Sequence, residues 1–273
     1  MELQTPKSAL SIAIRAALAA GQDIMDIYTD PKQDFGIERK ADNSPLTLAD
    51  KAAHRRIADM LKETTLPVLS EDGKHEDFEK RRLWDAFWLV DPLDGTKEFV
   101  KRNGEFTVNI ALVLEGRPHL GVIYVPVRQE LYFADPVLGA YKVEHITRLA
   151  DDERLPDLLE RALRLPLPQP EGRPYTVVAS RSHLSMETQM FIEEARKEHP
   201  EVETITSGSS LKICLVAEGA ADAYPRFAPT MEWDTAAGHA IAVCAGRQVY
   251  QAGSDQPLVY NKEDLHNPWF LVK

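Results

Sequence analysis

The stretch "WLVDPLDGTKEF", residues 88–99, carries the strongest signal in the chain. An apolar run ends in Asp91 and Asp94, and Gly95 and Thr96 follow directly. Two carboxylates at the end of a buried strand repel each other unless something neutralises them. Asp, Pro and Gly are also common turn residues, so a plain tight turn explains the same letters. The stretch alone leaves both interpretations open.

Composition excludes several classes of protein. The 273 residues carry 32 Lys and Arg against 43 Asp and Glu, a net charge of −11, with 44% hydrophobic residues. Such an acidic chain is not expected to bind nucleic acid, which attracts basic surfaces. The apolar stretch "ALSIAIRAALAAG" is interrupted by Arg15, so neither a membrane segment nor a signal peptide is expected. A cytoplasmic location follows, with loose attachment to the cytoplasmic face of the inner membrane left open.

Hydrophobic periodicity predicts an α+β first half. Thr5-Pro6 opens a long amphipathic helix that continues to Ile24, with Pro6 in its first turn. A second helix follows Thr47 and reaches Leu61. Residues 66–72 and 86–92 are expected to be short strands, and residues 106–143 an antiparallel meander.

The second half alternates strands and helices, which is typical of an α/β unit. Strands are predicted at 175–180, 202–207, 221–227 and 248–251, and helices at 186–198, 210–219 and 235–246. The charged, proline-rich residues 144–174 are expected to form a surface excursion with one short helix. We therefore predict an α/β protein with subdomains at 1–143 and 175–273, joined by 144–174. Cys214 and Cys244 lie in apolar runs and are expected to be free thiols.

Acidic residues recur where predicted elements end: Glu71, Asp91, Asp94 and Asp234. Each has an ordinary explanation, since Asp91 and Asp94 suit a turn and Asp234 suits a helix N-cap. Together they predict a cluster that needs a cation, and oxygen-only ligands suit Mg²⁺ shared with a phosphate. Free N–H groups after Gly95 and the Thr96 hydroxyl would hold that phosphate.

Asp50 is ambiguous. Thr47 and Asp50 have the spacing of a capping box, so Asp50 would complete the start of its helix. The functional alternative is a base or outer metal ligand that activates water together with a hydroxyl such as that of Thr96. Spacing alone favours the cap.

Four motifs in order resemble the lithium-sensitive, Mg²⁺-dependent phosphatase superfamily of inositol monophosphatases, fructose bisphosphatases and bisphosphate nucleotidases. They are "DNSPLTLAD" (42–50), "SED" (70–72), "DPLDGT" (91–96) and "WDTAAG" (233–238). The resemblance implies a layered αβαβα sandwich that binds two or three Mg²⁺. The implied metal ligands are Glu71, Asp91, the Leu93 carbonyl, Asp94 and Asp234. Asp50, Thr96 and Glu71 are the implied catalytic residues. Asp72 departs from the pattern, because a second glutamate is usual there.

Residues 208–242 resemble the bisphosphate nucleotidase branch. A second phosphate needs an anion pocket away from the metals, and Lys212 and Arg226 are candidates for it. The alternative is that both residues are ordinary surface charges. The resemblance implies further substrate contacts at Ser180, His183, Ser209, Ser210 and Tyr224, in addition to Glu71, Leu93, Asp94, Gly95, Thr96 and Asp234.

The expected reaction is hydrolysis of the 3'-phosphate of adenosine 3',5'-bisphosphate to AMP and phosphate, with the sulfated nucleotide as a second substrate, in sulfur assimilation. The alternatives are an inositol or sugar phosphatase on the same scaffold and a catalytically inactive regulator that binds nucleotide or metal. The expected partner is thus a phosphorylated small molecule, and the oligomeric state is left open.

Overall fold

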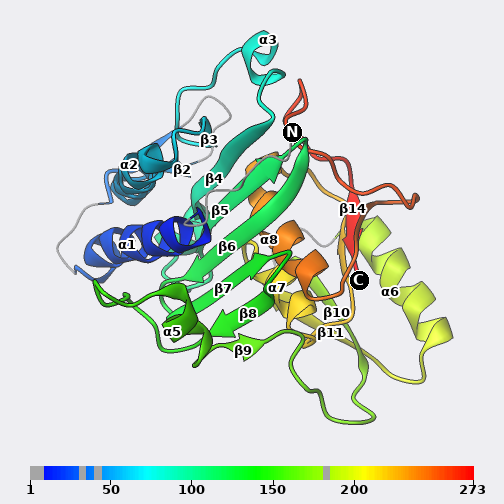
Figure 1. The fold of residues 1–273 in the computed structure, drawn as a ribbon. Helices are drawn as coiled ribbons and strands as arrows, with labels where there is room; N and C mark the ends of the chain where they lie inside the picture. Colours follow the sequence, from blue (N-terminus) through cyan, green and yellow to red (C-terminus); the bar gives the residue numbers. More distant parts are fainter. Residues whose placement is uncertain (1–8, 31–34, 40–44, 181–184) are drawn as a thin grey trace.

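The computed structural model describes residues 9–30, 35–39, 45–180 and 185–273. The elements stack in five layers (Figure 1): a helix pair, a large sheet, a second helix pair, two small sheets and one outer helix. The helices are α1 (Ala9–Thr29), α2 (Leu48–Leu61), a 3₁₀ turn (Lys62–Thr64), α3 (Phe78–Arg81), α4 (Thr96–Val100), α5 (Leu155–Leu159), α6 (Met186–Glu198), α7 (Leu211–Ala217) and α8 (Glu232–Cys244).

The strands are β1 (Glu38–Arg39), β2 (Pro45–Leu46), β3 (Val68–Ser70), β4 (Ala86–Asp94), β5 (Thr107–Leu114), β6 (Arg117–Val125), β7 (Glu130–Asp135), β8 (Gly139–Val143), β9 (Leu163–Arg164), β10 (Tyr175–Ser180), β11 (Val202–Ser207), β12 (Tyr224–Arg226), β13 (Val249–Gln251) and β14 (Phe270–Val272). This arrangement confirms the expected αβαβα sandwich.

The first layer packs α1 and α2 on one face of the large sheet. Leu10, Ile14, Leu18 and Ile24 recur at helical spacing and form the buried stripe of α1. Helix α2 begins with a capping box, because the Thr47 hydroxyl accepts from the Asp50 N–H and the Asp50 carboxylate accepts from the Thr47 N–H at 2.7 Å. The predicted position of Pro6 lies outside the described residues.

The large sheet has seven strands in the order β3 to β9. Within this sheet β3 and β4 pair in parallel, and the other pairs are antiparallel. Strands β5 to β8 form the antiparallel meander that was predicted for residues 106–143. The pairing of β4 with β5 shifts register between Asp91 and Asp94. Pro92 lies inside this shift and has no N–H to donate to a neighbouring strand. The "DPLD" residues therefore form a bulged strand end that redirects side chains, and the tight-turn interpretation is wrong.

Helices α7 and α8 cover the other face of the large sheet, and α8 lies across β4 to β8. The approach is close at Gly121 on β6, where an added Cβ would stand 2.2 Å from the Ala237 carbonyl oxygen. Behind these helices lie the parallel pair β10–β11 and the antiparallel sheet β12–β14–β13, with α6 outermost. One buried cluster joins residues of both halves, so the large sheet and the later helices share a core.

Buried ionic contacts also join the two halves. Lys142 on β8 lies 3.2 Å from a carboxylate oxygen of Glu218, which follows α7. The Tyr132 hydroxyl on β7 donates to Glu218 at 3.0 Å. Glu130 adds a second carboxylate 3.2 Å from the Lys142 ammonium. The end of α7 is thereby held to the large sheet.

Three expectations need correction. Residues 144–174 are more than a surface excursion, because β9 extends the large sheet and both Ile146 and Leu158 are buried in its core. Helix α8 begins at Glu232 and not at Thr235, and β14 was missed. The division at 143 and 174 itself stays a prediction. Both cysteines are free, as expected. Among the described residues, no helix has the length and hydropathy that crossing a membrane requires.

Candidate active site

The bulge that ends β4 brings backbone and side-chain oxygens together. Asp91 is buried, and its Oδ1 accepts from the Leu93 N–H at 3.1 Å. The Leu93 carbonyl in turn accepts from the Thr96 hydroxyl at 3.4 Å. Gly95 follows with φ +93°, a left-handed conformation that side chains rarely adopt, and α4 starts after it. This glycine therefore turns the strand end directly into the first turn of a helix.

Asp50 and Thr96 are hydrogen-bonded to each other. The Thr96 Oγ1 donates to Asp50 Oδ1 at 3.0 Å, while Asp50 Oδ2 accepts from the Thr47 N–H. Burial raises the pKa of Asp50 to about 6, against the hydrogen bonds from Thr47, and nearby Asp72 raises it further. The cap and the base interpretations are therefore compatible, because each uses a different oxygen of the same carboxylate.

The four acidic residues singled out in the sequence lie close enough to influence one another electrostatically. Burial raises the pKa of Asp91 well above its usual value, and the charges of Glu71, Asp94 and Asp234 raise it further. Burial and then the Asp94 charge raise the pKa of Asp234 in the same way. Groups from β4 and α8, over a hundred positions apart, thus lie close enough to repel one another.

The donor set of this cluster fits a hard divalent cation. Backbone N–H groups hold one oxygen of each aspartate, at 2.7 Å from Ser210 to Asp94 and at 2.8 Å from Met231 to Asp234. The remaining carboxylate oxygens suit a cation that prefers oxygen ligands and offsets their repulsion. In the described part of the chain, no group of three or more His, Cys, Asp or Glu side chains is already arranged so that it could hold a metal ion. Asp234 lies in the first turn of α8 and not at its N-cap, which is Met231.

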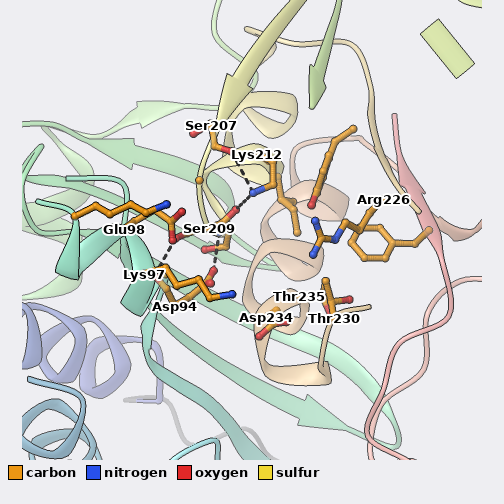
Figure 2. Close-up of a pocket in the computed structure, with 17 residues that line it drawn as sticks. Asp94, Lys97, Glu98, Ser207, Ser209, Lys212, Arg226, Thr230, Asp234 and Thr235 are labelled. Carbon is orange, nitrogen blue, oxygen red and sulfur yellow. Dashed lines mark hydrogen bonds between the residues drawn. The ribbon is translucent and has the colours of Figure 1, made fainter. Parts of the chain in front are cut away.

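A cavity of about 440 Å³ opens beside this cluster (Figure 2). Asp94 and Asp234 line one end, and Lys212 and Arg226 line the other. The complete lining is Asp94, Gly95, Lys97, Glu98, Lys101, Ser207, Gly208, Ser209, Ser210, Lys212, Ile213, Tyr224, Arg226, Thr230, Asp234, Thr235 and Phe270. One pocket therefore offers a cation site and an anion site side by side.

Lys212 is not an ordinary surface charge. It is buried, and its Nζ donates to the Ser209 carbonyl at 2.6 Å and to the Ser207 carbonyl at 3.4 Å. The ammonium lies 5.5 Å from the centroid of the Tyr224 ring. Burial lowers the pKa of Lys212 to about 8, although the Asp94 charge opposes the shift. A cation held in this way retains attraction for an incoming anion.

Arg226 completes the basic end of the pocket. Its Nη2 donates to the Pro229 carbonyl at 3.0 Å, whereas its Nε is buried and makes no hydrogen bond. A buried donor without a partner is costly and is usually explained by a ligand or a solvent molecule. The Nε–H of Arg226 is therefore available to donate a hydrogen bond to a ligand.

Residues 207–210 connect the two ends of the pocket. The Ser209 hydroxyl donates to the Asp94 carbonyl at 2.9 Å and to the Glu105 carbonyl at 2.7 Å. The Ser210 hydroxyl donates to Asn109 Oδ1 at 2.7 Å, and Asn109 Nδ2 donates to Asp94 at 3.4 Å. Sequence reasoning missed Asn109 and Glu105. Asn109 had a signal, because it is a polar residue inside the apolar run "FTVNIALV".

The structure brings together most residues proposed from the sequence. Beside one another lie Asp50, Glu71, Asp91, Leu93, Asp94, Gly95, Thr96, Ser209, Ser210, Lys212, Tyr224, Arg226 and Asp234. Ser180 is the last residue of β10. His183 lies outside the described residues, so its predicted contact with the nucleoside stays a prediction.

Comparison with known proteins shows the family of the chain. Residues 6–268 match the family model described as "Inositol monophosphatase family". The chain belongs to the inositol monophosphatase family. This confirms the family and the fold that the four motifs indicated.

Several relatives of the chain, and one similar solved structure, are CysQ proteins. The 3'(2'),5'-bisphosphate nucleotidase CysQ of Escherichia coli strain K12 is 46% identical over 256 residues, which are 93% of this chain and 94% of that protein. The CysQ of Haemophilus influenzae is 32% identical over 96% of this chain and 91% of its own length. The crystal structure of CysQ from Bacteroides thetaiotaomicron is 60% identical, with a TM-score of 0.91, covering 98% of this chain and 97% of that one.

Proposed function

We propose that the chain is a metal-dependent 3'(2'),5'-bisphosphate nucleotidase that removes the 3'-phosphate of adenosine 3',5'-bisphosphate and releases AMP and phosphate. The observation that carries this proposal is the pocket with carboxylates at one end and Lys212 and Arg226 at the other. A substrate with a phosphate at each end matches both. The likeness to the CysQ proteins supports the same activity, and the sulfated nucleotide is proposed as a second substrate.

The metal is proposed to be Mg²⁺, with two or three ions per site. The groups that would hold it are the carboxylates of Glu71, Asp91, Asp94 and Asp234 and the carbonyl of Leu93. When bound, the metal supplies positive charge against the phosphoryl oxygens and their developing negative charge. Mg²⁺ suits this set because it is bound by a few carboxylates and shared with substrate phosphate oxygens.

The protein groups have separate tasks in the proposed reaction. Thr96 Oγ1 receives a proton from the attacking water as it passes its own proton to Asp50 Oδ1, along the 3.0 Å hydrogen bond between them. The N–H groups of Gly95 and Thr96 hold the scissile phosphate at the start of α4. Lys212 and Arg226 hold the second phosphate. Ser180, His183, Ser209, Ser210 and Tyr224 are proposed to contact the rest of the nucleotide.

Phosphate release from a substrate panel tests the proposal. With Mg²⁺ present, adenosine 3',5'-bisphosphate is expected to give a higher kcat/KM than inositol 1-phosphate or fructose 1,6-bisphosphate. A preference for inositol 1-phosphate would place the chain with the sugar-alcohol phosphatases. No turnover of any substrate would favour the inactive regulator. Action in the cytoplasm, in sulfur assimilation or at a membrane face stays a prediction outside this test.

Two substitutions test the second-phosphate site separately. Lys212→Ala and Arg226→Ala each remove a charged hydrogen-bond donor, which is worth about 1.5–3 kcal/mol, or roughly 10- to 100-fold in binding. KM is expected to rise for adenosine 3',5'-bisphosphate and to change little for adenosine 3'-monophosphate. Equal losses on both substrates would place the second phosphate elsewhere.

A further inference from the structure

Lys97 lines the pocket but belongs to none of the roles assigned so far. It follows Thr96 in the first turn of α4, and its side chain is exposed. Its ammonium makes no hydrogen bond or ion pair with the described residues, although Asp94, Glu98 and Asp234 line the same pocket. A lysine among acids that pairs with none of them keeps its donors for another partner.

Two other pocket cations, Lys212 and Arg226, are fixed, whereas Lys101 lines the pocket as an exposed residue at the C-terminal end of α4. Lys212 is tied to the Ser207 and Ser209 carbonyls, and Arg226 is tied to the Pro229 carbonyl. Figure 2 shows the Lys97 side chain extending across the pocket, with its amine toward the side where Asp234 and Thr235 lie. Lys97 therefore serves the acidic end of the pocket, from its open side.

We infer that Lys97 is a substrate-binding residue that contacts the scissile phosphate at the mouth of the pocket. This inference rests on the proposed phosphatase function. The N–H groups of Gly95 and Thr96 approach that phosphate from one side, and the residue next in the chain supplies a cation from the open side. A free lysine pays rotamer entropy when it binds, so it contributes less than a preorganised cation. It also attracts the anion before contact, which increases the rate of capture.

Steady-state kinetics of Lys97→Gln and Lys97→Arg test the inference. Glutamine is expected to raise KM roughly tenfold, the lower end of what a charged hydrogen bond contributes, with kcat within about twofold because the proton-transfer pair is intact. The increase should be the same for adenosine 3',5'-bisphosphate and adenosine 3'-monophosphate, since both carry the scissile phosphate. Arginine should restore most of the loss. Lys197→Gln on α6, whose lysine is 68% exposed and paired with Glu194, is the matched control.

Salt dependence gives a second measurement. The kcat/KM of the wild-type protein should fall with ionic strength more steeply than that of Lys97→Gln, because one attracting charge has been removed. An unchanged KM in Lys97→Gln, or an effect on the bisphosphate alone, would overturn the inference. If the wild-type protein prefers inositol 1-phosphate, the proposed nucleotide specificity fails. The role of Lys97 is then tested by whether Lys97→Gln raises the KM for inositol 1-phosphate.

Discussion

Asp50 shows that the spacing of neighbouring residues predicts only some of a residue's contacts. Its spacing to Thr47 predicts a helix cap, and the cap is present. The same spacing says nothing of Thr96, which is 46 positions away and donates to the other carboxylate oxygen. A pairing of Asp50 with the Thr96 hydroxyl was one alternative that spacing did not favour, and the resemblance to a family, carried by several motifs together, favoured it. A local pattern identifies a local contact, and the second partner needs the fold.

Activity should depend on the charge of Asp50. As the proton acceptor, Asp50 must be ionised, and burial raises its pKa to about 6. The kcat/KM should therefore fall about tenfold per pH unit below pH 6. Asp50→Asn should reduce the rate roughly 10²- to 10⁴-fold, and its remaining activity should not fall in this way below pH 6.

Thr47→Ala is the informative companion to that change. The hydrogen bond from the Thr47 hydroxyl lowers the pKa of Asp50, so its loss should move the acid limb of the pH–rate profile to higher pH. The bond from the Thr47 backbone N–H stays in this variant. If the fall of kcat/KM at acid pH occurred at the same pH in Thr47→Ala and was still present in Asp50→Asn, it would be assigned to another group.

Binding of the second phosphate should weaken at alkaline pH. The pKa of Lys212 is lowered to about 8 by burial, so the residue is charged below that pH and neutral above it. The kcat/KM for adenosine 3',5'-bisphosphate should fall above pH 8, while that for adenosine 3'-monophosphate should not. Lys212→Arg, which stays charged, should remove the difference. The same alkaline fall for both substrates would contradict the assigned role.

At the scale of elements, the periodicity of apolar residues predicted most helices and strands, whereas contacts between distant segments were not predicted. The helices and the antiparallel meander were predicted because their apolar residues repeat at 3.6 or 2 positions. The β14 strand was missed because Phe270–Val272 is too short to show a period. The hydrogen bonds of Ser209 to Asp94 and Glu105 join residues over a hundred positions apart, and no local pattern encodes such a contact.

Gly95→Ala should damage the joint between β4 and α4. An added Cβ would lie 2.2 Å from Ser209 Oγ, at a backbone φ of +93°. Ser209 would have to move and release its bonds to Asp94 and Glu105, so kcat/KM should fall at least tenfold, with a lower melting temperature. Gly172→Ala is the matched control, because it has φ +72° and no atom within 4 Å of an added Cβ. It should lose stability from backbone strain alone, and an equal loss of activity would refute the argument.

At the scale of the whole molecule, the acidic cluster links metal binding to stability. Glu71, Asp91, Asp94 and Asp234 come from both halves of the chain and repel one another. That repulsion opposes the folded state, and a bound cation offsets it. The sequence predicted that these acids would form one group, which stays a prediction, but it did not indicate that backbone N–H groups hold Asp94 and Asp234.

Added Mg²⁺ should therefore raise the melting temperature. At a hundred times the dissociation constant, mass action contributes about 2.7 kcal/mol, which is on the order of 5 °C for a chain of this size. Asp91→Asn should melt at a higher temperature than the wild-type protein without metal, because one buried charge is gone, and should lose the shift with metal. A wild-type protein that melts identically with and without millimolar Mg²⁺ would contradict the clustered site.

The packing of α8 on the large sheet has a consequence for biosynthesis. The Ala237 backbone covers Gly121 so closely that only glycine fits there, yet more than a hundred residues separate the two along the chain. While a ribosome is still translating the second half, this face of the sheet stays open to water and to other chains. The acidic cluster also lacks Asp234 until the same helix emerges. A truncated translation product would therefore expose an uncovered sheet, which makes it a target for chaperones and proteases and not a partly active enzyme.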